Sequence, residues 1–155
     1  MHYTGTIWRP PYEAASLLSE VTAGCSHHKR KFCTLYHDLP FKFRMSPLED
    51  IESDVREVQR AMKGWNRGHT RRVFLTGANP FVLSYDKLTA IADLIRKYLP
   101  FVKSIGSFAR ITDITSKTDK KLAKLRDMGY DGLTIGIETD DDEALRFINK
   151  GYTVF

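Results

Sequence analysis

The sequence predicts an α/β fold in which about four strand–helix units form a partial parallel (βα) barrel. Four short apolar or β-branched runs are each followed by a helical pattern. The last three runs begin 31 and 29 residues apart, a spacing typical of one strand, one helix and two loops. None of them alternates cleanly between apolar and polar residues, as expected for strands buried on both faces. The predicted strands are residues 17–22, 73–76, 104–108 and 133–137.

Capping residues and apolar stripes predict one helix after each strand. The first helix opens with a capping box from Ser46 to Glu49 and has Pro47 at its first helical position. The other helices begin at polar caps and end at glycine or before proline. The predicted start and stop residues are, in chain order, Ser46 and Gly64, Ser84 and Pro100, Thr115 or Ser116 and Gly129, and Asp140 and Gly151.

The connection between residues 22 and 46 is the most unusual part of the chain. Its length exceeds the roughly 15 residues above which a loop in a compact domain is usually functional or disordered. It contains both cysteines of the chain, and in α/β barrels chemistry gathers at the carboxyl ends of the strands, where this loop is expected. Its other notable side chains are the histidines His27, His28 and His37, the cations Lys29, Arg30, Lys31, Lys42 and Arg44, and the single acid Asp38.

Length and composition exclude several classes of protein. The chain has 155 residues, enough for one domain, and its 42% apolar and 28% charged residues exclude a disordered or collagen-like chain. No apolar run approaches the ~20 residues of a membrane helix, and no secretory signal is visible. We therefore expect a cytoplasmic protein without a membrane partner. A net charge of +5 is too small to point to nucleic acid.

The C-terminal residues predict an incomplete barrel. Residues 151–155 lead out of the fourth predicted helix, and no fifth strand follows. Four units would make half of a closed barrel, with both edges of the sheet open. We expect an extended lead-in over residues 1–15 and an incomplete domain over residues 16–155, as part of a longer gene product.

Residues 24–33 read GCSHHKRKFC, directly after a predicted strand. This stretch resembles the cluster loop of the radical S-adenosylmethionine (SAM) superfamily, in the group with the spacing C-x4-C-x2-C. Cys25 and Cys33 match the first and third cysteines, and Phe32 matches the aromatic residue before the last one. The resemblance implies that Cys25 and Cys33 are ligands of a [4Fe-4S] cluster and that Phe32 contacts the adenine of SAM.

Arg30 occupies the position of the middle cysteine in this motif. Thiolates hold the irons of such clusters, whereas a guanidinium has only hydrogen-bond donors and stays charged. The substitution removes one ligand and adds positive charge where iron would bind. We therefore expect this chain to assemble its cluster poorly or not at all.

Two further segments are similar to SAM-contacting segments of the same superfamily. After the second strand, Gly77 and Asn79 lie where the family carries a Gly-Gly-Glu-like segment that contacts the SAM amino group. After the fourth strand, residues 136–139 read GIET and are similar to a Gly-Ile-Glu-Ser segment near the ribose and methionyl groups, which implies a contact from Glu138. The resemblance runs from about Leu17 to Gly151.

Each of these residues also has a structural interpretation. Cys25 and Cys33 can be buried small apolar residues, and Gly77 can be needed for a backbone conformation with positive φ. The remaining interpretations are a core position for Phe32, a turn for Asn79 before Pro80, and a helix cap for Glu138.

The resemblance implies an enzyme that binds a [4Fe-4S] cluster and SAM and takes an electron from a donor. Such an enzyme generates a 5′-deoxyadenosyl radical that acts on a substrate, here unknown. Arg30 and the missing strand–helix units predict that this activity is impaired, and no catalytic residue of the chain is assigned. One alternative is a non-catalytic truncated fragment or interaction module. The other is a small zinc or nucleic-acid binding module built on Cys25, Cys33 and the histidines His27, His28 and His37.

Overall fold

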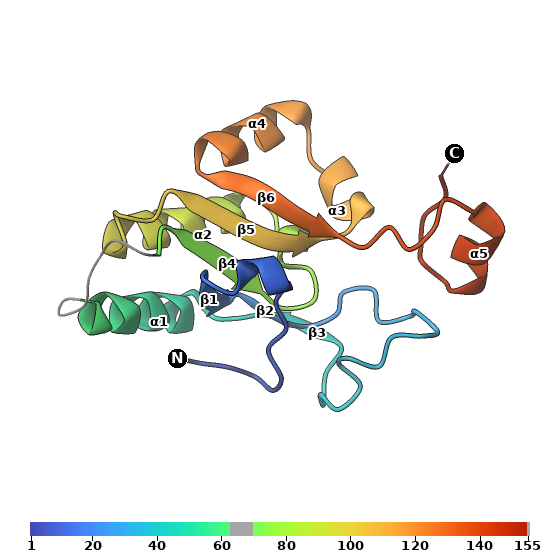
Figure 1. The fold of residues 1–155 in the computed structure, drawn as a ribbon, viewed down its shortest axis with the longest axis horizontal. Helices are drawn as coiled ribbons and strands as arrows, with labels where there is room; N and C mark the ends of the chain where they lie inside the picture. Colours follow the sequence, from blue (N-terminus) through green and yellow to red (C-terminus); the bar gives the residue numbers. More distant parts are fainter. Residues whose placement is uncertain (63–69, 155) are drawn as a thin grey trace.

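A computed structural model describes residues 1–62 and 70–154 of the chain (Figure 1). Its centre is a parallel sheet with the strand order β1-β4-β5-β6, and helical connections join its strands. This is the predicted α/β architecture, consistent with a partial βα barrel of radical SAM type. The strands are β1 (Leu17–Glu20), β4 (Arg72–Thr76), β5 (Ser104–Ala109) and β6 (Tyr130–Ile135).

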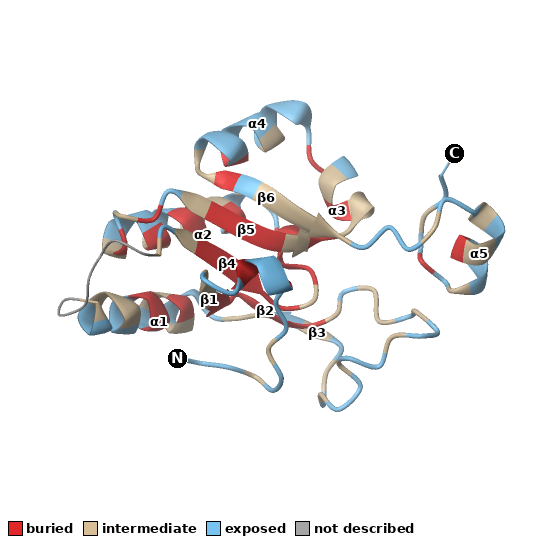
Figure 2. Ribbon diagram, viewed as in Figure 1, coloured by how far each residue is buried: buried red, intermediate tan, exposed pale blue. Residues whose placement is uncertain are grey.

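Three helices cover one face of the sheet and form the core with it (Figure 2). They are α1 (Leu48–Ala61), α2 (Tyr85–Tyr98) and α4 (Asp119–Asp127). Their apolar side chains recur at steps of three and four residues, so each helix presents one apolar stripe to the sheet. The core includes Ile51, Val55, Leu88, Ile91, Ile95 and Leu125 from the helices and Val73, Leu75, Ile105 and Tyr130 from the strands.

The N-terminal segment lies against the opposite face of the sheet. Its 3₁₀ turn, Pro11–Glu13, places the buried Glu13 carboxylate 2.9 Å from the guanidinium of Arg72. The Arg72 side chain extends over Gly106 and Gly132, which pair in register on β5 and β6. A Cβ at either glycine would collide with this guanidinium. The two glycines therefore leave room for the ion pair that fastens the N-terminal segment to the sheet.

The first predicted strand is divided in the structure. β1 ends at Glu20, and β2 (Thr22–Gly24) leaves the parallel sheet to pair antiparallel with β3 (Phe43–Met45). Gly24 has a φ of +76° and lies so close to the Lys42 carbonyl that a side chain would not fit there. β3 is not among the predicted strands, and the long connection joins the two strands of this antiparallel pair.

Three of the four predicted helix caps differ from the structure. Ser46 is not the cap: its backbone N–H donates to the carbonyl of Val21, the N-cap position is held by an extended Pro47, and the helix begins at Leu48. The expected cap at Thr115 or Ser116 is instead the end of a short helix, α3 (Ile111–Thr115). Helix α4 follows it with Thr118 as its cap.

The remaining predicted boundaries are closer to the structure. Ser84 caps α2 as predicted, and its hydroxyl accepts from the backbone N–H of Lys87. Asp141, not Asp140, caps α5 (Asp142–Phe147), because its carboxylate accepts two backbone N–H groups of the first turn. The fourth strand, β6, begins three positions before the predicted strand, at Tyr130. Gly64 and His69 lie outside the described residues.

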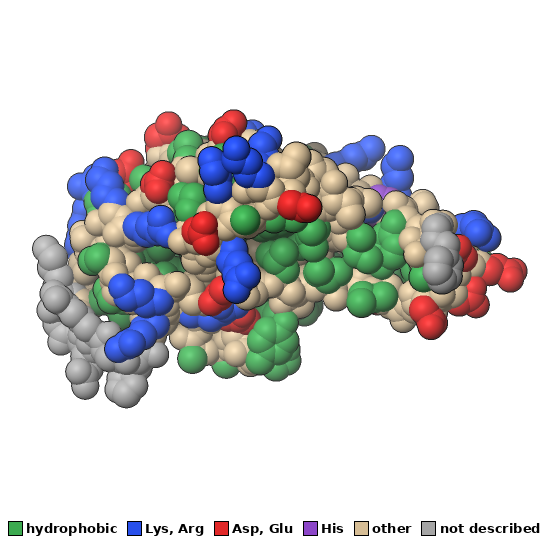
Figure 3. Space-filling model, turned by 90° about the horizontal axis from the view of Figure 1, so that it is seen from above, with side chains coloured by type: hydrophobic (Ala, Val, Ile, Leu, Met, Phe, Trp, Pro, Cys, Tyr) green, Lys and Arg blue, Asp and Glu red, His purple; other side chains and the backbone are tan. Residues whose placement is uncertain are grey.

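β1 and β6 are the edge strands of the described sheet. Figure 3 shows apolar side chains gathered along the middle of the face seen from above. Ile137 and Phe147, which follow β6 in the chain, have exposed fractions of 58% and 70%.

Across residues 1–62 and 70–154, the helices are too short or too polar to cross a membrane.

Candidate functional site

The predicted cluster ligands line one small pocket in the cysteine loop, which we define as residues 25–42. Cys25 and Cys33 share this pocket with Arg30 and with four further residues of the loop. The cavity has a volume of about 20 Å³, which is roughly the space of one water molecule. The other lining residues are His28, Lys29, Tyr36 and His37.

The antiparallel pair of β2 and β3 positions the first cysteine. The backbone N–H of Cys25 donates to the carbonyl of Lys42 over 2.8 Å, and its Sγ accepts from the backbone N–H of His28 over 3.4 Å. Both cysteines are free thiols. Burial, and to a lesser extent the charges of the Cys25 and Cys33 thiolates, raise the pKa of Tyr36 to about 12. The phenol of Tyr36 therefore lies within electrostatic reach of both sulfur atoms.

Arg30 lines the pocket and reaches out of it toward the end of β6. Its guanidinium lies 3.9 Å from the Glu138 carboxylate, and its Nε is buried without a hydrogen-bond partner in the described part of the chain. The whole sequence holds two cysteines, so the third thiolate of a cluster loop has no source. Within residues 1–62 and 70–154, no three Cys, His, Asp or Glu side chains are grouped to hold a metal ion. The residues present therefore do not fit a three-thiolate cluster site.

Glu138 follows β6 with a positive φ of 72° and is held by cations. Its carboxylate lies 2.5 Å from the ammonium of Lys150, a side chain that is 1% exposed. Burial lowers the pKa of Lys150, the hydrogen bond that its ammonium donates to Glu138 opposes that effect, and the charges of Arg30 and Arg110 lower the pKa again. Glu138 is not the cap of α5, because Asp141 fills that role.

Asn79 is almost fully buried and connects the cysteine loop to α3. Its amide nitrogen donates to the Ser26 hydroxyl over 2.7 Å and to the Asp113 carboxylate over 3.1 Å. Its amide oxygen accepts from the backbone N–H of Ser26 over 3.4 Å. The side-chain amide is thus engaged by protein groups on both sides, and it fixes the residue next to Cys25.

Gly77 and Phe32 lie apart from the thiol pocket. Gly77 has a φ of +120°, and a Cβ there would overlap both the side chain and the carbonyl of Thr22. Phe32 is 53% exposed, so the interpretation as a core residue is wrong. The structure thus brings the two cysteines together, joins Glu138 to them through Arg30, and joins Asn79 to them through Ser26.

Sequence reasoning missed two cations at this end of the sheet, Arg110 and Lys150. Arg110 directly follows β5, and its guanidinium donates to the Lys150 carbonyl over 3.3 Å. A polar residue at the carboxyl end of a predicted strand was the available signal for Arg110. No local pattern marked Lys150 as buried.

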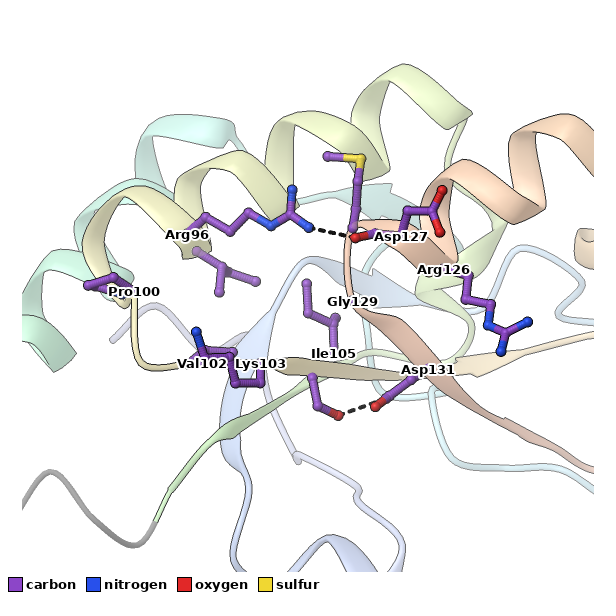
Figure 4. Close-up of a pocket in the computed structure, with 12 residues that line it drawn as sticks. Arg96, Pro100, Val102, Lys103, Ile105, Arg126, Asp127, Gly129 and Asp131 are labelled. Carbon is purple, nitrogen blue, oxygen red and sulfur yellow. Dashed lines mark hydrogen bonds between the residues drawn. The ribbon is translucent and has the colours of Figure 1, made fainter.

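A larger cavity of about 570 Å³ lies at the opposite end of the strands (Figure 4). Its lining residues come from the amino ends of β5 and β6 and from the ends of α2 and α4. Arg96 donates to the Asp127 carbonyl over 3.0 Å, and the Ser104 hydroxyl donates to Asp131 over 2.7 Å. Because parallel sheets place their chemistry at the carboxyl ends of the strands, we do not take this cavity as the candidate site.

Comparison with known proteins agrees with the geometry of the cysteine loop and the sheet. A family model described as the radical SAM superfamily matches residues 19–154, nearly the whole chain. Searches of curated proteins and of solved structures found no match. Because this match covers nearly the whole chain, the chain belongs to the radical SAM superfamily.

Proposed function

We propose that this chain is a radical SAM domain, spanning about residues 16–155, in which Arg30 has removed the ability to hold the [4Fe-4S] cluster. One observation carries the proposal: Arg30, which by resemblance matches the middle cysteine of the motif, lines the same pocket as Cys25 and Cys33. The superfamily is one of enzymes that cleave SAM, and we propose that this chain does not catalyse that reaction.

Ligand chemistry and charge both support the proposed loss. A guanidinium cannot give up its proton in a protein, so Arg30 offers iron no lone pair. The substitution also replaces the negative charge of a thiolate with a positive one beside two remaining thiols. The Glu138 carboxylate lies 3.9 Å from this guanidinium, so the two opposite charges attract each other.

Binding of SAM, use of an electron donor and action on a substrate are therefore proposed only for a chain whose third thiolate has been restored. The substrate class is not assigned. Two free thiols are compatible with a reducing compartment, and we propose the cytoplasm.

The test is anaerobic reconstitution with iron and sulfide of the parent chain, of Arg30→Cys and of Lys29→Cys. Lys29 lines the same pocket, so Lys29→Cys is a matched control that adds a thiol one position away from the motif. Iron and acid-labile sulfide per chain are then measured. We expect Arg30→Cys to approach roughly four of each and the other two chains to stay far below.

Equal incorporation in the parent chain and in Arg30→Cys would refute the proposal. So would equal incorporation in Arg30→Cys and Lys29→Cys, because the position of the thiol would then not matter. Circular dichroism of all three chains establishes that the substitutions leave the fold intact.

A further inference from the structure

Three cations from three different connections converge at the carboxyl end of the sheet. Arg30 comes from the cysteine loop, Arg110 follows β5, and Lys150 follows α5. Arg30 and Lys150 approach the same oxygen of Glu138, at 3.9 Å and 2.5 Å. Arg110 hydrogen-bonds to the backbone carbonyl of Lys150. We call Arg30, Arg110 and Lys150 the cation cluster.

The cation cluster has more positive charge than its surroundings balance. Among the described residues, Glu138 forms ion pairs with Arg30 and Lys150, whereas the Asp113 carboxylate accepts from the backbone N–H of Arg110. The three cations therefore meet one carboxylate in an ion pair. The charges of Arg30 and Arg110 also lower the pKa of the buried Lys150, which adds to the effect of its burial. Like charges held together in a partly buried place destabilise one another, and a bound anion relieves that repulsion.

Two donors of the cation cluster have no acceptor. The Nε atoms of Arg30 and Arg110 are both buried, and neither has a hydrogen-bond partner among the described residues. A buried donor without an acceptor carries a desolvation penalty. The guanidinium groups of both residues can present pairs of parallel N–H donors, which match the oxygens of phosphate and carboxylate groups.

Glycine keeps the space around this cluster open. A Cβ at Gly151 would lie 2.9 Å from the Arg110 guanidinium and 2.9 Å from the ring of His27. A Cβ at Gly136 would lie 3.5 Å from the Lys150 ammonium. Side chains at these two positions would therefore crowd the cation cluster, and glycine avoids that crowding.

We propose that the cation cluster of Arg30, Arg110 and Lys150 binds a phosphoryl group, either free inorganic phosphate or the phosphate of a small phosphomonoester. The surplus positive charge matches a dianion, and the unpartnered guanidinium donors match tetrahedral oxygens. This proposal goes beyond the proposed loss of the cluster and does not depend on it.

Isothermal titration calorimetry with inorganic phosphate tests the proposal on the full chain. We expect the parent chain to bind with a Kd of about 1 mM or tighter, and Arg30→Gln and Arg110→Gln to bind about tenfold more weakly or worse. Arg96→Gln is the matched control, because it removes a guanidinium from the cavity at the other end of the strands. It should bind phosphate as the parent chain does.

Two further ligands distinguish the two sources of phosphate. If AMP binds more tightly than inorganic phosphate and adenosine does not bind, the site recognises a phosphomonoester. If AMP and inorganic phosphate bind equally, the site recognises the free ion. Adenosine binding as tightly as AMP overturns the proposal, because the phosphoryl group would then not be what is recognised. The proposal is also overturned if phosphate fails to bind the parent chain, or if Arg30→Gln and Arg110→Gln both retain full affinity. The iron content of Arg30→Cys has no bearing on these outcomes.

Discussion

At Gly77 the backbone by itself already requires glycine. A φ of +120° and the overlap that any Cβ would make with Thr22 both require glycine where the chain leaves β4 and contacts the first residue of β2. The interpretation of Gly77 as a residue that serves a positive φ is therefore borne out by the geometry. Its predicted contact with SAM stays a prediction.

We expect Gly77→Ala to lower the free energy of unfolding by about 2–4 kcal/mol, since it adds backbone strain and a collision with buried main-chain atoms. Urea unfolding followed by circular dichroism measures this loss. A loss below about 1 kcal/mol relative to the parent chain would contradict this account.

At the scale of elements, the turn after α5 is fastened to the cysteine loop. The side-chain amide of Asn149 donates to the Lys29 carbonyl over 3.0 Å, and its own carbonyl accepts from the His27 ring over 2.7 Å. The Lys31 ammonium lies 4.6 Å from the centre of the Phe147 ring. Residues that are about 120 positions apart in sequence thus hold each other in place.

Replacing Asn149 by glycine tests this connection without straining the backbone. Asn149 has a φ of +54°, which glycine adopts freely, so the substitution removes only the side-chain hydrogen bond to Lys29. One such bond contributes about 1 kcal/mol, so we expect amide hydrogen exchange in residues 27–31 to become roughly fivefold faster. Exchange in α1 serves as the internal reference. Unchanged exchange in residues 27–31 would show that this bond does not hold the loop.

The elements that sequence predicts well are those with their own local signals. Each parallel strand is an apolar run, and Ser84 caps α2 as its position before an apolar stripe predicts. β3 has no such local signal. It forms by pairing with β2, and that pairing depends on Gly24, where the absence of a side chain lets the backbone come close to the Lys42 carbonyl. Neighbouring acids, Asp140 and Asp141, likewise offer the same cap chemistry, and only the folded backbone decides between them.

For the molecule as a whole, the core and the candidate site are separate. The core lies between the sheet and α1, α2 and α4, whereas the cysteine loop extends beyond the carboxyl ends of the strands (Figure 1). Sequence could predict that both cysteines lie in one loop. The cation cluster could not be predicted, because Arg30, Arg110 and Lys150 come together only through the packing of three separate connections.

This separation predicts that metal removal leaves the folded protein unaffected. We expect the thermal unfolding midpoint of the parent chain to be the same before and after treatment with a chelator, because no thiol belongs to the core. Circular dichroism at rising temperature measures the midpoint. A fall of several degrees on chelation would mean that a bound metal stabilises the parent chain, contrary to the account given for Arg30.

Native mass spectrometry of the anaerobically reconstituted chains tests the central claim most directly, because it weighs the intact protein with whatever it holds. We expect Arg30→Cys to gain the mass of four irons and four sulfides and the parent chain to keep its cofactor-free mass. A parent chain that gains the same mass as Arg30→Cys would contradict the claim that Arg30 prevents cluster assembly.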